Sequence, residues 1–133
     1  MSEKSVRVAW ILWAAMLGAL ANYAVLVVIT PAPPDLQVPQ HMAMLVAVLG
    51  FGAVVMAGSS LLLAPLLGRL FHSFWVYYVA RLLFAESIGT LALVLAFMGA
   101  PPVVSLAFGG VALALLLIAA PTARHREAAL ERI

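Results

Sequence analysis

Polar residues are so sparse along this chain that they divide it into four long apolar stretches. The stretches cover approximately residues 8–29, 42–64, 74–98 and 103–120. Because about 20 apolar residues suffice for a helix to cross a bilayer, the pattern predicts an all-α integral membrane protein. We expect one domain over residues 1–133, a four-transmembrane-helix antiparallel bundle in which short connections make successive helices neighbours. Unbroken apolar runs, without alternation, disfavour a β-barrel.

Prolines and glycines mark the expected ends of these stretches. A proline-rich connector over residues 30–39 follows the first stretch, and Pro65 and Gly68 are expected to end the second. Residues 99–102 predict a tight turn whose prolines also begin the last helix. The short basic tail, residues 121–133, is helix-prone and is expected at the headgroup level or in water.

Composition agrees with a membrane protein and excludes several kinds of site. The chain is 66% hydrophobic and 9% charged, against roughly 45–50% apolar residues in a soluble domain. It has no cysteine, and its three histidines are not spaced as ligands on one helix, so we expect no metal site. No motif of a soluble enzyme and no cofactor-binding motif is present, which predicts a protein that is not an enzyme.

The distribution of basic residues predicts the orientation. All but one of the seven lie before the first stretch, between the second and third, or after the fourth. By the positive-inside rule, both termini are therefore expected in the cytoplasm of a multi-pass cell (inner) membrane protein. The first stretch continues past the signal-peptide-like Ala19-Leu20-Ala21, so we expect a retained helix. The net charge of +2 suits anionic lipid and does not indicate nucleic acid. Arginine outnumbers lysine, as in GC-rich bacterial genomes.

Glu86 is the main candidate for chemistry, because it interrupts the third apolar stretch near its middle. Aromatic residues at the start of this stretch are expected to form an interfacial belt that fixes its depth. A rise of about 1.5 Å per residue places Glu86 roughly 18 Å beyond Phe74, near the bilayer midplane. A carboxylate there costs about 2.5–3.5 kcal/mol, so the neutral acid is the expected resting form unless a cation lies beside it.

The neighbours of Glu86 on the same stretch suggest how it is used. Arg81 diverges from it by roughly 140° around the helix, which leaves two interpretations: a snorkelling anchor, or a counter-ion for Glu86 on a neighbouring helix or subunit. Gly89 and Thr90 share the face of Glu86. Gly89 is expected to admit another helix, and Thr90 to hydrogen-bond either the carboxyl or its own backbone.

Two other stretches carry candidate polar contacts. The second is rich in small residues around Gly52 and Gly58, which predicts that it packs closely against the third. Ser59 and Ser60 either supply hydroxyls to an ion site or bond back to their own helix. Asn22 in the first stretch is expected to act as an interhelical hydrogen-bonding group, with a binding residue as the alternative.

The run from Glu86 to Phe97, with small and apolar residues after the carboxylate, resembles the carboxylate helix of rotary ATPase proteolipids, the c subunits. The small-residue stretch before it and the basic turn at Gly68-Arg69 extend the resemblance over about residues 42–98. The resemblance implies a ring-forming hairpin in which Glu86 binds and releases a proton or sodium ion. The turn lacks the Arg-Gln-Pro motif of proteolipids, and a further helix flanks the hairpin on each side.

Three functions are therefore open at the level of sequence. The first is a small non-catalytic subunit or scaffold that assembles in a membrane complex or homo-oligomer, with Glu86 used for helix or subunit contacts. The second is a proton- or ion-translocating proteolipid-like subunit whose exchangeable group is Glu86. The third is a small oligomeric transporter, which predicts a water-filled cavity lined by Asn22, Ser60 and Glu86. All three have the lipid bilayer and other membrane chains as partners.

Overall fold

The computed structural model describes residues 1–29 and 40–132, which are almost entirely helical. The expected connector over residues 30–39 lies outside the described residues. The elements in chain order are these helices: α1 (Glu3–Ile29), α2 (Gln40–Gly58), the π-helical η1 (Ser59–Leu63), α3 (Ala64–Leu70), α4 (Phe74–Phe97), α5 (Pro102–Ile118) and α6 (Ala123–Arg132). Three continuous helical spans, Glu3–Ile29, Met42–Leu70 and Phe74–Phe97, are long and apolar enough to cross a membrane. A fourth is reached if the bent pair formed by α5 and α6 is one span.

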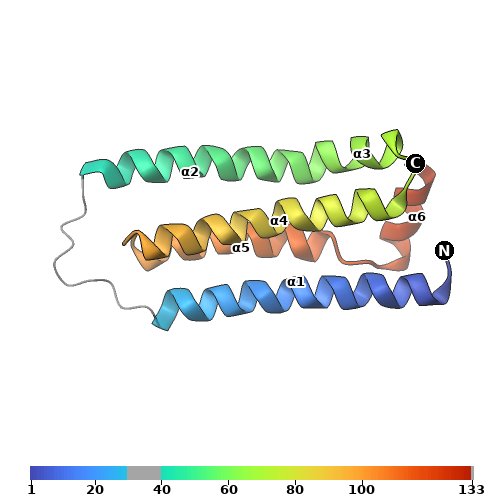
Figure 1. The fold of residues 1–133 in the computed structure, drawn as a ribbon, viewed down its shortest axis with the longest axis horizontal. Coiled ribbons are helices and arrows are strands. Elements are labelled where there is room, and N and C mark those ends of the chain that lie inside the picture. The colour runs from blue at the N-terminus through green and yellow to red at the C-terminus, as the bar shows by residue number, and fades with distance from the viewer. Residues whose placement is uncertain (30–39, 133) are drawn as a thin grey trace.

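Helices α4 and α5 form the middle of the bundle, with α1 on one side and α2 on the other (Figure 1). Both termini and the turn between α3 and α4 lie at one end, which we call the terminal end. The prediction that the first two long helices are neighbours is therefore wrong, because α4 and α5 lie between them. A connection of about ten residues can span more than 30 Å, so chain length does not force α1 against α2.

Helix α4 is the most enclosed of the long helices. Within its apolar window 39% of residues are buried, against 11% for α1 and 6% for the span Met42–Leu70. Its buried residues include Tyr78, Leu82, Ile88 and Leu95, none of which is accessible. Hydrogen bonds tie the elements together at the terminal end: the Tyr78 hydroxyl donates to the Ala9 carbonyl over 3.3 Å. The bundle is thus organised around α4.

The second helical span does not end at Pro65 and Gly68, as predicted, but continues to Leu70. Proline lacks an N–H and its ring collides with the carbonyl four residues earlier in a regular α-helix. Here the preceding turn is π-helical, and the Ala64 N–H donates to the carbonyl of Ser59, five residues back. This wider turn accommodates the proline without breaking the helix.

Gly68 makes a closer contact with a neighbouring helix than the glycines of α2 do. A β-carbon at that residue would lie 2.6 Å from Cβ of Tyr77, so only glycine fits between α3 and α4. By contrast, hypothetical β-carbons at Gly50 and Gly52 of α2 meet only side-chain tips, at 3.7 and 3.8 Å. The small-residue stretch therefore packs against α4, as predicted, but its closest approach comes after the predicted end of the helix.

The turns follow from local sequence. Ser73 caps α4, since its side chain accepts a hydrogen bond from the N–H of Val76 over 3.4 Å. Gly99 has φ 87°, a left-handed conformation that suits glycine, and Pro102 begins α5 as predicted. After α5 the chain bends by 79° and α6 lies across the terminal end of the bundle.

Candidate functional site

Glu86 lies near the middle of α4 and is only half-buried as a residue, but its carboxyl group is shielded. Both carboxyl oxygens are inaccessible, and neither has a hydrogen-bond partner among the described residues. The phenol of Tyr23, on α1, lies close enough to act on the carboxyl, but the two groups do not form a hydrogen bond. An unpaired buried carboxylate is costly, so this group is expected to carry its own proton or to gain a partner that the described residues do not supply.

Gly89 explains why α1 reaches this part of α4. A β-carbon at Gly89 would lie 2.8 Å from Cδ1 of Leu20 and 3.4 Å from the ring of Tyr23. The glycine therefore admits a neighbouring helix on the face of Glu86, as the sequence predicts. The helix that approaches is α1, whereas the small-residue stretch was the expected partner.

The hydroxyl groups next to Glu86 serve the backbone of α4. Thr90 is exposed, and its Oγ1 donates to the backbone carbonyl of Glu86 over 3.3 Å. Ser87 likewise donates to the carbonyl of Leu83 over 2.8 Å. Thr90 thus follows the second of its two predicted roles and leaves the carboxyl unpaired.

Arg81 is buried, and its guanidinium turns away from Glu86 toward the terminal end. Its Nη1 donates a hydrogen bond to the hydroxyl of Tyr77, four residues earlier on α4, and the guanidinium carbon lies 5.9 Å from the centre of that ring. Nε of Arg81 has no partner among the described residues. The Arg81 side chain points in the direction expected of a snorkelling arginine, but its charged group is buried inside the protein. Arg81 is not a counter-ion of Glu86 within the described part of this chain.

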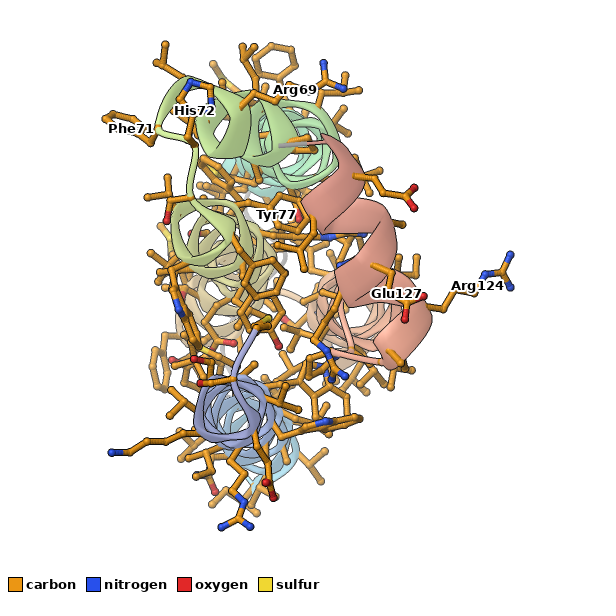
Figure 2. The ribbon with its side chains drawn as sticks, turned by 90° about the vertical axis from the view of Figure 1, so that its right-hand side faces the viewer. Arg69, Phe71, His72, Tyr77, Arg124 and Glu127 are labelled. Carbon is orange, nitrogen blue, oxygen red and sulfur yellow. The ribbon has the colours of Figure 1, made fainter. Side chains whose placement is uncertain are left out.

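Tyr77 links Arg81 to the C-terminal helix. Its hydroxyl is 3.0 Å from Nε2 of His125 on α6, and the two rings are stacked with centroids 6.0 Å apart. Figure 2 shows Tyr77 beneath α6, which crosses the end of the bundle, with Arg124 and Glu127 pointing outward. Tyr77 and Tyr78 are buried, so the expected interfacial belt at the start of α4 is in large part a packed aromatic cluster.

Ser60 and Asn22 occupy environments that differ from those predicted. Ser60 is buried in η1, and its Oγ donates to the backbone carbonyl of Arg81 over 3.1 Å, so its proton goes to α4 and not to its own helix. Ser59 is half-buried in the same turn. Asn22 is exposed and makes no hydrogen bond to another helix in the part of the chain that the structure describes. The geometry brings Glu86 together with Tyr23 and Gly89, and not with the serines or Asn22.

The contacts made at the site by three residues, Tyr23, Tyr77 and His125, were not predicted from the sequence. Tyr77 lies four residues before Arg81, a spacing that places both on one helix face and could have indicated the contact. Tyr23 and His125 come from distant segments and carry no such local signal. Among the described residues, no group of three metal-ligating side chains meets.

Comparisons with known protein families, with characterised proteins and with solved structures found no match. The site must therefore be interpreted from its own geometry.

Proposed function

We propose that this chain is a small non-catalytic subunit of a membrane complex or homo-oligomer, and that the half-buried Glu86 side chain turns its carboxyl outward to form the main polar contact with a neighbouring subunit. The observation that carries the proposal is the unpaired Glu86 carboxyl, shielded in the middle of the most buried helix. A carboxyl in the centre of a bilayer costs about 2.5–3.5 kcal/mol, which a hydrogen-bond donor from another subunit would offset in part.

The surface of the bundle supports a location in the bilayer. Large apolar side chains of α2 and η1 are exposed along this helical span, namely Met44, Val48, Phe51, Val54 and Leu62. Such a face is stable next to lipid or another apolar subunit, and not in water. The terminal end carries most of the basic residues, which supports a multi-pass orientation with both termini in the cytoplasm.

The test is the size of the native particle before and after Glu86 is changed. The protein is extracted from its own membranes in a mild detergent, and particle mass is measured by native mass spectrometry. We expect wild-type particles to contain further subunits. Glu86→Leu, which removes every hydrogen-bonding atom, is expected to release them, whereas Glu86→Gln retains an amide and is expected to release fewer.

Glu127→Leu is the matched control, because Glu127 is exposed on α6 and undergoes the same chemical change. It is expected to leave particle mass unchanged. A wild-type particle that consists of one chain alone would overturn the proposal. Retention of all subunits by Glu86→Leu would overturn it as well, since the contact would then not depend on the carboxyl.

Proton exchange at Glu86 is the second candidate function, favoured by the engagement of Arg81 with Tyr77, which leaves no cation beside the carboxyl among the described residues. The resemblance to proteolipids belongs to this candidate. It predicts that a hydrophobic carbodiimide labels Glu86 and that both Glu86→Gln and Glu86→Leu abolish proton flux in proteoliposomes while particle mass stays constant. Unlabelled Glu86 with unchanged flux would exclude it.

A further inference from the structure

A cavity opens on the side of the bundle between α1, α4 and α5. Its volume is about 330 Å³, within the range of small-molecule sites. Small residues from all three helices create the space: Ala21, Ala24, Gly89, Ala92 and Gly109. A β-carbon at Gly109 would meet nothing within 4 Å, so the volume beside it is not filled by protein. Ala21, Leu106 and Gly110 on its rim are exposed, and the cavity therefore has an opening on the outer surface.

One polar side chain in the lining has no partner. Ser105 is 1% exposed, lines the cavity, and its Oγ makes no hydrogen bond within the described residues. A serine in a helix commonly bonds the carbonyl four residues earlier. Here that carbonyl, of Pro101, accepts the backbone N–H of Val104 over 3.0 Å and that of Ser105 itself over 3.5 Å. The hydroxyl thus remains available to a ligand in the cavity.

The order of polar and apolar groups along the cavity defines the shape of its ligand. Ser105 lies in the first turn of α5, near the end of the bundle opposite the termini, and the lining continues along α5 to Leu113. At about 1.5 Å per residue this apolar part is roughly 12 Å long. A ligand that fits has a hydrogen-bond acceptor at the helix end and a hydrocarbon chain running toward the middle of the bundle. Water does not satisfy so apolar a lining.

We propose that the cavity binds one acyl chain of a membrane glycerolipid, whose ester carbonyl accepts a hydrogen bond from the Ser105 hydroxyl. This inference rests on the membrane location in the proposed function. In a bilayer the ester carbonyls lie near the interface and the chains lie below them, the same order as Ser105 and the apolar lining. The open side of the cavity, between exposed apolar residues of α1 and α5, would face lipid and let the chain enter sideways.

The test uses a phosphatidylcholine that carries a photoreactive diazirine in the middle of one acyl chain. The full chain is reconstituted in vesicles of this lipid, irradiated, and the cross-linked residues are located by mass spectrometry. We expect cross-links to concentrate on residues 17–27 and 105–113. Gly109→Leu adds a side chain whose β-carbon meets nothing within 4 Å, and it is expected to reduce these cross-links at least fivefold by occupying the cavity, whereas Gly58→Leu, also beside open space, leaves them unchanged.

The role of Ser105 is tested with an ether-linked analogue of the same lipid, which lacks the carbonyl. Ser105→Ala is expected to lower cavity cross-links severalfold with the ester lipid, and to have no effect with the ether lipid. Equal loss with both lipids would mean that the serine shapes the cavity without bonding the ester, and would overturn that part of the proposal.

Cross-links at Phe51, which is 72% exposed on α2, separate failure of this inference from failure of the membrane location. Strong labelling of Phe51 with none in the cavity would overturn only the lipid site. Labelling nowhere would overturn the membrane location itself. If cavity labelling rises when the protein is diluted with lipid, a second copy occupies the cavity and the proposal is wrong. Glu86→Leu is expected to keep the cavity labelling, because the carboxyl does not line the cavity.

Discussion

Gly68 of α3 packs directly against Tyr77 of α4, and Gly68→Ala is the substitution that tests this contact. The added methyl group would lie 2.6 Å from Cβ and 3.4 Å from Cα of Tyr77. These atoms belong to the backbone or are attached to it, so they cannot move aside without moving α4. We therefore expect α3 and α4 to separate slightly and the contacts of Tyr77 to weaken.

The size of the effect follows from two opposing terms. Overpacking at a well-packed position costs about 1–3 kcal/mol. Replacing glycine by alanine in a helix contributes about 0.5–1 kcal/mol in the opposite direction. Gly58→Ala isolates the second term, because Gly58 is helical and nothing lies within 4 Å of its hypothetical β-carbon. The difference between the two variants is then the overpacking term, with Gly68→Ala less stable by about 1–3 kcal/mol.

The assay is reversible unfolding in mixed micelles of dodecyl maltoside and dodecyl sulfate, followed by far-ultraviolet circular dichroism. Gly58→Ala is expected to unfold at a slightly higher fraction of dodecyl sulfate than the wild type, and Gly68→Ala at a lower fraction than Gly58→Ala. If Gly68→Ala matched or exceeded the stability of Gly58→Ala, the close approach of α3 to α4 would be refuted.

Three further substitutions test individual hydrogen bonds in the same unfolding assay. Ser60→Ala removes the donor to the Arg81 carbonyl and is expected to cost about 0.5–1.5 kcal/mol, whereas no loss would argue against that bond. Trp13→Phe removes a 2.7 Å bond from Nε1 to the backbone of α5 and is expected to cost about as much, while the exposed Trp10→Phe serves as a control that should have little effect. Tyr77→Phe removes the acceptor of the buried Arg81 guanidinium and is expected to cost about 1–3 kcal/mol, because a buried charged group loses its partner; an unchanged midpoint would contradict the described network.

The sequence is sufficient to predict the helices but not how they are ordered in space. Apolar runs of bilayer length, Gly99 and the prolines at 101–102 identify the long helices and the last turn correctly. Pro65 misleads, because local preference marks it as a helix end while the π-helical turn before it absorbs the strain. The separation of α1 from α2 cannot be predicted from connection length, since it depends on which helix is buried by contacts with all the others.

The candidate site is predictable in part. The position of Glu86 on α4 and the helix approach at Gly89 follow from helical periodicity. The proximity of Tyr23 to Glu86 depends on where α1 lies in the bundle, and no local sequence pattern specifies that location. The contact between Tyr77 and His125 depends on the 79° bend after α5, and this bend brings together residues that are distant in the chain.

The π-helical turn η1 has a consequence for changes in the length of the chain. A π-helical turn takes up about one residue more than an α-helical turn, so deleting one residue from Ser59–Leu63 is expected to convert it into a regular α-helical turn. Pro65 would then follow a regular α-helical turn, in which its ring collides with the carbonyl four residues earlier and kinks the helix, although far-ultraviolet spectra would register little change. A single-codon deletion at this turn is therefore expected to be far more damaging than its effect on helix content suggests, because a kink at Pro65 would move Gly68 away from Tyr77.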